Sequence, residues 1–198
     1  MDNYVDFHVH TTCSDGKLTP QELIDFACNN HIDYISITDH NTISAYEGDL
    51  ELKGVNLISG IEIDLEQEDD IQFLCYDFNT NSKKIKEALK QIQKGRLSIC
   101  TKLMMRLRRM GLSAVSLESF IEHINDFDYI CKIMVDSGFG STIEEVKRKY
   151  FEPGKELYFK TPVFQVEDCI AMFHEAGGKV VLAHPGRIKV KQKKLESI

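Results

Sequence analysis

The chain has 198 residues, of which 42% are hydrophobic and 28% charged, so it is long enough to enclose a core and has the composition of a soluble globular domain. It has no run of about 18 apolar residues that could cross a membrane, and its first residues, MDNYVDF, lack the features of a signal peptide, which predicts a cytoplasmic location. The net charge of −7 argues against general affinity for nucleic acid, and six cysteines without a CxxC pair argue against a cysteine-bound zinc.

The first eighty residues alternate between strand-like and helix-like segments. Residues 4–10 (YVDFHVH) alternate as a β-strand does, and a helix is predicted after Thr19 as N-cap, with Pro20 at its first position and Glu22 completing a capping box. Strand-like runs follow at YISIT, at VNLISGIEIDLE, where Gly60 marks a bend or a close approach, and at IQFLCYDF. Strand–helix–strand units at this spacing predict a parallel sheet or barrel.

The middle of the chain has a helical pattern throughout. After Ser82, apolar residues recur at helical spacing, with Gly95 as a candidate kink and Gly111 as the expected helix end. The segments LESFIEHI, YICKIMVDSG and TIEEVKRKYF predict three more helices. We therefore predict a helical insertion subdomain at residues 82–160, within a core formed by residues 1–81 and 161–198. In the last part, QVEDCIAMFHEAGG predicts a helix and KVVLAHPGR a strand.

Residues with metal-binding side chains fall at the predicted strand ends. His8 and His10 are two apart, so they point to one face of the first strand, and Asp15 comes from the turn after it. The carboxyl ends of strands in parallel α/β folds form the functional site. We therefore expect six side chains to meet at one rim, namely His8, His10, Asp15, His40 (in SITDHN), Glu62 (in SGIEI) and His184 (in LAHPGR).

This donor set predicts a particular chemistry. Histidine and carboxylate ligands without cysteine suit zinc, manganese or iron(II), and several carboxylates indicate more than one ion. Two or three divalent ions about 3.5–4 Å apart are the usual arrangement for in-line displacement at phosphorus. Arg187 either binds a phosphate or is a solvent-facing loop residue. Asp39 orients a ligand, binds the metal itself or caps its strand end.

The motifs resemble those of the PHP (polymerase and histidinol phosphatase) domain family, particularly its stand-alone bacterial phosphoesterases. The resemblance rests on DFHVHTTCSDGKLTPQELIDFA, ISITDHNT, SGIEI and VVLAHPGR, and it covers essentially the whole chain. It implies a distorted (β/α)7-type barrel with a two- or three-metal centre that hydrolyses phosphate esters, with nucleotides or short oligonucleotides as substrates of stand-alone relatives. It also implies metal binding by the six residues above.

Catalytic roles are expected for three residues. Asp15 and His40 would act in the metal centre while metal-activated water attacks phosphorus, and Arg187 would stabilise the charge that develops.

The chain departs from the family pattern at three places. Gln72 stands where a metal-binding histidine is expected and is a weaker candidate ligand, and Tyr129, in YICKIM, replaces another histidine and is expected to hydrogen-bond a phosphate. The chain ends at Ile198 without the family's Asp-x-His motif, so we expect a C-terminally shortened barrel, either because the sequence is truncated or because the protein is a shortened relative. The alternative function is a catalytically weak or inactive PHP-like protein that binds an anionic ligand or a partner. An unfinished barrel also exposes a strand edge, through which a homodimer could form.

Overall fold

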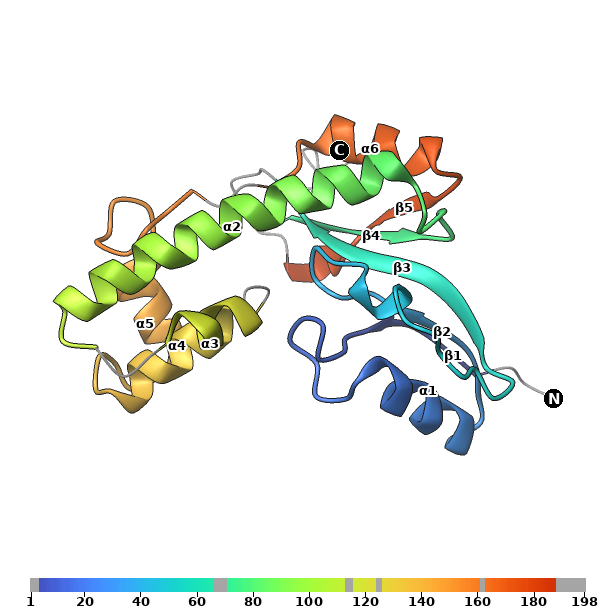
Figure 1. Cartoon of the computed structure of the whole chain (residues 1–198), viewed down its shortest axis with the longest axis horizontal. Coiled ribbons are helices and arrows are strands. Elements are labelled where there is room, and N and C mark those ends of the chain that lie inside the picture. The colour runs from blue at the N-terminus through green and yellow to red at the C-terminus, as the bar shows by residue number, and fades with distance from the viewer. Residues whose placement is uncertain (1–3, 66–70, 113–115, 124–125, 161–162, 188–198) are drawn as a thin grey trace. The chain divides into compact units, whose positions relative to one another are not determined.

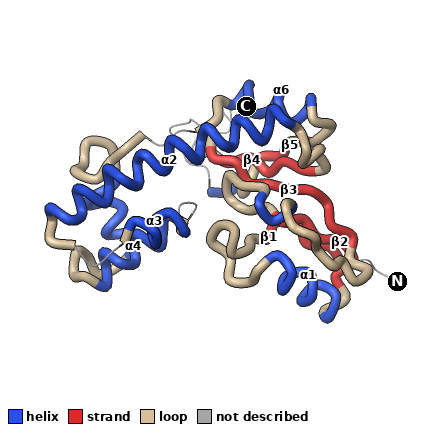
Figure 2. Tube along the Cα trace, viewed as in Figure 1, coloured by secondary structure: helices blue, strands red, loops and turns tan. Residues whose placement is uncertain are grey.

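The computed structural model describes residues 4–65, 71–112, 116–123, 126–160 and 163–187. The chain divides into two compact units, one formed by residues 1–89 with 163–198 and the other by residues 90–162. The first unit contains the sheet and the second is helical (Figures 1 and 2). Helix α2 (Lys83–Arg109) begins in the first unit and continues into the second.

A five-stranded sheet with the order β1-β2-β3-β4-β5 forms the centre of the first unit (Figure 2). The first three strands pair in parallel, whereas β4 is antiparallel to both of its neighbours. The strands are β1 (Tyr4–Val9), β2 (Ile32–Ile37), β3 (Asn56–Asp64), β4 (Gln72–Tyr76) and β5 (Lys179–Leu182).

The expected parallel pairing is therefore right for β1 to β3 and wrong for the two pairs that involve β4. Residues 65–71 alone join β3 to β4. A parallel crossover needs a dozen or more residues, so a link of this length forces β4 to return antiparallel. Two antiparallel steps restore the direction, and β5 runs the same way as β3.

The sheet curls strongly, which brings its two edges toward each other (Figure 1). Although β1 and β5 are at opposite ends of the strand order, the rings of His8 and His184 stack with centroids 5.8 Å apart. The hydroxyl of Tyr76 in β4 also donates a hydrogen bond to the carbonyl of Phe7 in β1 at 2.7 Å. The described strands thus form a half-barrel, in which β1 and β5 do not pair, and the seven-unit barrel stays a prediction.

Two helices pack on the sheet of the first unit. Helix α1 (Pro20–Asn29) begins with the predicted capping box, since the Thr19 side chain accepts from the Glu22 backbone and the Glu22 carboxylate from the Thr19 backbone. Its buried stripe, which includes Ile24, packs with Ile35 and Ile37 of β2. Helix α6 (Val166–Glu175) places Phe173 edge-on against Phe78, with ring centroids 4.9 Å apart.

The second unit has its own apolar core, which is built entirely from helical segments and their loops. Besides α2 it contains α3 (Leu117–Glu122), α4 (Phe127–Asp136), α5 (Ile143–Val146) and a π-helical turn, η2 (Lys147–Phe151). The core gathers side chains from across the unit, among them Leu107, Phe120, Met134 and Leu157.

The predicted helices of this part are present, with two differences in detail. Helix α2 continues through Gly95, and it ends at Arg109 just before Gly111, which has a φ of +95°, as the predicted helix end requires. The helix expected over TIEEVKRKYF changes to π-helical geometry at Lys147. In the described part of the chain, the helices fall short of the length or the hydropathy that a membrane span needs.

Candidate metal centre

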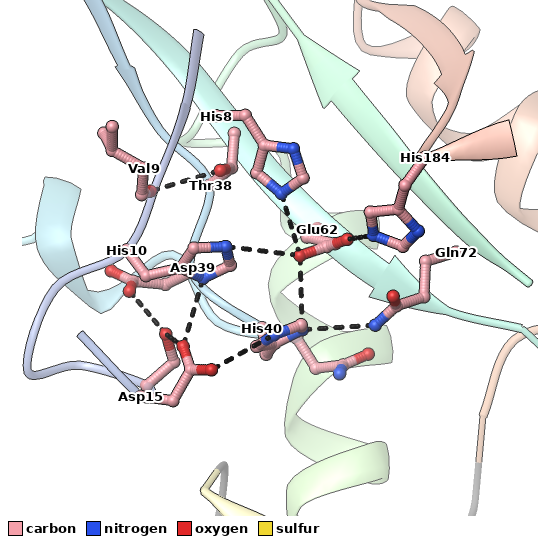
Figure 3. A network of polar contacts seen from close by, with 12 residues as sticks. His8, Val9, His10, Asp15, Thr38, Asp39, His40, Glu62, Gln72 and His184 are labelled. Atoms are coloured by element: carbon pink, nitrogen blue, oxygen red, sulfur yellow. Dashed lines mark hydrogen bonds and ion pairs between the residues drawn. The ribbon is translucent and has the colours of Figure 1, made fainter. Parts of the chain in front are cut away.

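The predicted metal ligands gather at one rim of the curled sheet, where the carboxyl ends of its parallel strands meet (Figure 3). His10, His40 and His184 come just after the carboxyl ends of β1, β2 and β5, which all run in the same direction. Glu62 lies in β3, and Gln72 is the first residue of the antiparallel β4. Strand direction therefore brings these side chains to a common rim, as the sequence predicted.

The Glu62 carboxylate lies at the centre of four imidazole rings (Figure 3). It is 1% exposed, and its Oε2 lies 3.2 Å from His8 Nε2, 3.4 Å from His10 Nε2 and 3.5 Å from His40 Nδ1. Its Oε1 lies 2.8 Å from His184 Nε2. Both oxygens of one buried carboxylate thus face ring nitrogens, an arrangement in which the carboxylate can bridge two cations.

The site residues separate into two groups whose ligand atoms each lie within 4.8 Å of one another. Group A consists of His8, Glu62 and His184, and group B consists of His10, Asp15 and His40. In group B the Asp15 carboxylate lies between the two rings, 3.2 Å from His10 Nδ1 and 3.6 Å from His40 Nε2. All six residues predicted as ligands are in one of these two groups.

An unsatisfied nitrogen in group B shows that these residues fit a cation. His10 Nδ1 is buried and has no hydrogen-bond partner among the described residues, although Asp15 Oδ1 is 3.2 Å away. Buried polar atoms normally have a partner, so an unpaired one calls for a further group. A divalent ion shared by His10 and Asp15 would satisfy both atoms, because a metal ligand directs its lone pair at the ion instead of at the neighbouring ligand.

The two rings of group B have pKa values shifted in opposite directions. Burial, with the charge of His40, lowers the pKa of His10 below its ordinary value of 6.5. Burial alone would also lower the pKa of His40, but Asp15 and Glu62 outweigh it and raise that pKa. The ring of His40 lowers the pKa of Asp15 to about 2. At neutral pH, His10 is therefore neutral and Asp15 ionised, which are the forms that bind metal.

Gln72, where the resemblance led us to expect a histidine, lies beside group B. Its amide nitrogen donates to Asp64 Oδ1 at 2.8 Å and is 3.4 Å from His40 Nδ1. Asp64 also accepts from the Asn41 side chain at 2.7 Å. The sequence analysis missed Asn41 and Asp64. Asp64 had a detectable signal, since it lies two residues after Glu62 on the same strand and therefore on the same face.

The side chain of Asp39 faces the loop that follows β1. Its oxygens accept hydrogen bonds from Thr11 and Ser14 in the loop that follows β1. It belongs to neither of the two groups of candidate ligands. Asp39 therefore bonds the loop that carries Asp15 and leaves the candidate ligands to face one another.

Two further residues, Arg187 and Tyr129, were predicted to bind substrate. Arg187 ends a short 3₁₀ turn, η3 (Pro185–Arg187), directly after His184, and its side chain is outside the described part of the structure. Tyr129 lies in the first turn of α4 in the helical unit, where its hydroxyl contacts Ser119 Oγ and its ring stacks on His123 with centroids 3.8 Å apart. The roles expected for both residues stay predictions.

Comparisons with known proteins agree on one family. The model of the PHP domain matches residues 6–196. The 5'-3' exoribonuclease Rnm of Salmonella typhimurium is 30% identical over 203 residues, which cover 98% of this chain and 69% of the relative. The 3',5'-nucleoside bisphosphate phosphatase of Chromobacterium violaceum is 27% identical over 192 residues, covering 92% of this chain and 67% of the relative.

Solved structures show the same relationship at the level of the fold. A C. violaceum amidohydrolase with bound sulfate and no metal superposes with a TM-score of 0.80 at 26% identity, over 98% of this chain and 71% of that one. A candidate metal-dependent phosphoesterase from Bifidobacterium adolescentis has a TM-score of 0.75 at 21% identity, over 98% of this chain and 73% of that one. With a family model that spans residues 6–196 and relatives that align along nearly its whole length, this chain belongs to the PHP domain family.

Proposed function

We propose that this protein is a metal-dependent phosphoesterase that hydrolyses a phosphate ester of a nucleotide, a short oligonucleotide or another small molecule. The observation that carries the proposal is the pair of histidine–carboxylate groups that meet at Glu62. Such a pair suits two divalent ions acting together at one phosphate. Phosphoesterase activity is also what the names of the related proteins have in common.

The proposed ligands are the six residues of groups A and B, with Gln72 as a weaker candidate. Zinc, manganese or iron bound there, as two or three ions, would supply Lewis acidity and a nucleophile at neutral pH. Glu62 would bridge the groups through its two oxygens, and His8 and His184 would complete group A.

Three residues have proposed roles in the reaction itself. Asp15, whose pKa is lowered to about 2, would stay ionised, and its carboxylate would hold the His40 ring, whose Nε2 lies 3.6 Å away, in the metal centre. Arg187 would bind the phosphate, because a guanidinium can donate two parallel hydrogen bonds to it. Its position three residues after His184 supports this assignment.

The substrate proposal follows from the relatives. One is named for acting on RNA and another for acting on nucleoside bisphosphates, and both are nucleotide phosphate esters. Tyr129 would contribute a hydroxyl to phosphate binding from the helical part of the chain, which we propose to be an insertion at residues 82–160 in a core of residues 1–81 and 161–198. A homodimer through the exposed edge of β1, where Tyr4 is 65% and Val5 55% exposed, completes the proposal.

A metal analysis and a phosphatase assay on one preparation test the proposal. After loading with Mn²⁺ or Zn²⁺, the wild type should hold at least two ions per chain, and it should release phosphate from adenosine 3',5'-bisphosphate or mononucleotides from a short RNA. Glu62→Gln should lower the metal content, and it should reduce the rate of hydrolysis by at least about 100-fold. Glu51→Gln, which changes an exposed glutamate in the same way, should match the wild type. Equal rates for the two variants would contradict the proposed centre.

The alternative function is a weak or inactive PHP protein that binds an anion or a partner. The observation that favours it is the Gln72 amide, whose nitrogen donates to Asp64 at the position where the resemblance implies a histidine. On this alternative, the preparation binds metal and inorganic phosphate without turnover. Gln72→His then becomes the decisive variant, because a gain of hydrolysis would show that the missing imidazole was the defect.

A further inference from the structure

The loop between β1 and α1 carries Asp15, and a buried carboxylate from another strand end holds it in place. Asp39 is 1% exposed. Its Oδ1 accepts from the Thr11 backbone N–H and from Ser14 Oγ, and its Oδ2 accepts from Thr11 Oγ1, each at 2.6 Å. Hydrogen bonds to an ionised carboxylate are the short, strong kind, and three of them converge here.

Thr11 is in turn the anchor of the whole loop. Its carbonyl accepts hydrogen bonds from the backbone of Ser14 at 3.0 Å and of Gly16 at 2.9 Å, the residues on either side of Asp15. Its hydroxyl accepts from the Cys13 backbone at 3.2 Å. Asp15 itself has a side chain that is 44% exposed. The place of its carboxylate between His10 and His40 thus depends on Thr11, and Thr11 depends on Asp39.

The main chain at Asp39 connects the same loop to Glu62. The Asp39 carbonyl accepts from the Glu62 N–H at 3.3 Å, and the Asn41 N–H donates to the Glu62 carbonyl at 2.8 Å. His40 lies between these two bonds. In the described part of the chain, by contrast, the hydrogen bonds of the Asp39 side chain go to Thr11 and Ser14, and none joins it to a side chain of group A. The Asp39 side chain therefore supports the loop of group B alone, and a variant that changes only this side chain tests that role.

We propose that Asp39 is a positioning residue of the metal centre, whose carboxylate fixes the Asp15 loop and so sets the affinity of group B for its ion without setting that of group A. This inference rests on the proposed metal centre. Residues that support a metal ligand from behind typically change metal affinity by about 10- to 100-fold when they are altered.

Calorimetric titration of the metal-free full chain with Mn²⁺ tests the proposal. Reference isotherms come from His184→Ala for loss of group A and from Asp15→Asn for loss of group B. Asp39→Asn and Thr11→Val should each weaken Mn²⁺ binding at one of the two sites by about 10- to 100-fold. The affected site should be the one that is lost in the reference isotherm of Asp15→Asn. Thr11→Ser, which keeps the hydroxyl, should restore wild-type binding. Equal weakening of both sites, or unchanged binding in Asp39→Asn, would overturn the proposal.

Tyr46→Phe is the matched control for a general loss of stability. The Tyr46 hydroxyl bonds the backbone of β2 and β3, donating to the Ile37 carbonyl at 2.6 Å and accepting from the Gly60 N–H at 2.8 Å. Its loss should lower the melting temperature and leave the ratio of the two Mn²⁺ affinities unchanged. If Tyr46→Phe altered that ratio as Asp39→Asn does, the positioning role would be refuted.

Hydrogen exchange separates this proposal from the metal centre on which it rests. In the metal-free protein, Asp39→Asn should speed exchange of the Thr11, Ser14 and Gly16 amides, whereas Tyr46→Phe should not. If the wild type bound no Mn²⁺, the metal centre would fall, while faster exchange in Asp39→Asn would still support the fixing of the loop. Unchanged exchange in Asp39→Asn would overturn the positioning role whatever the metal result.

Discussion

Replacing Gly16 by alanine should weaken metal binding by group B while leaving the fold intact. A Cβ at this position would lie 2.2 Å from the His10 carbonyl oxygen and 2.6 Å from the Thr11 nitrogen, and both atoms belong to the backbone. An ordinary van der Waals contact begins at 3.4 Å, so the loop or the end of β1 must move by about 1.2 Å, the difference between 3.4 and 2.2 Å. Asp15 is the preceding residue and moves with the loop.

The expected loss follows from that displacement. A misplacement of about 1 Å can cost about 100-fold in rate, and metal affinity changes of about 10- to 100-fold accompany disturbed support of a ligand. Overpacking costs typically about 1–3 kcal/mol of stability, which a domain of this size can survive. We therefore expect Gly16→Ala to fold, to bind one Mn²⁺ ion about 10- to 100-fold more weakly than the wild type and to hydrolyse phosphate esters about 100-fold more slowly.

The assay compares Gly16→Ala with Gly48→Ala, because a Cβ on Gly48 meets no atom within 4 Å. Calorimetric Mn²⁺ titration, phosphate release and urea denaturation are measured on both variants. Affinities and rates of Gly16→Ala within threefold of Gly48→Ala would refute the reasoning, since they would show that the loop can move without disturbing Asp15.

Three further predictions concern the fold and the pH dependence of the centre. Gly60→Ala places a Cβ 2.1 Å from Ser36 Oγ and 3.0 Å from the Ile37 carbonyl, so urea denaturation should show a loss of about 1–3 kcal/mol, and an unchanged midpoint would contradict the close approach of β2 and β3. Thr19→Ala removes the N-cap of α1 and should cost about 1 kcal/mol in the same experiment, whereas Thr19→Asn should largely preserve stability; equal losses would exclude capping as the cause. Because the pKa of metal-free His40 is raised, a proton competes with the metal at low pH, so Mn²⁺ affinity should rise from about pH 6 to about pH 8. Calorimetry over that range measures the effect, and a flat affinity would show that His40 loses no proton on binding.

The sequence alone determined the local features and the chemistry of the site. The capping box of α1 needs only Thr19 and Glu22 three residues apart, and the order of strand and helix patterns placed β1 to β3. Histidines and carboxylates at the strand ends predicted the contents of groups A and B because strand direction brings such ends to one rim. The motifs identified the family for the same reason, since they consist of these residues and their neighbours.

The tertiary structure decided which of these residues face one another and what supports them. Whether β4 and β5 run parallel or antiparallel is a matter of pairing between distant segments, and an apolar run looks the same in either direction. The central place of Glu62, reached by His8 from one edge of the sheet and by His184 from the other, exists because the sheet curls. Asp39 was ambiguous for the same reason. Its neighbour in sequence is His40, but its hydrogen-bond donors are 28 and 25 residues away, at Thr11 and Ser14, and only the folded chain brings them to it.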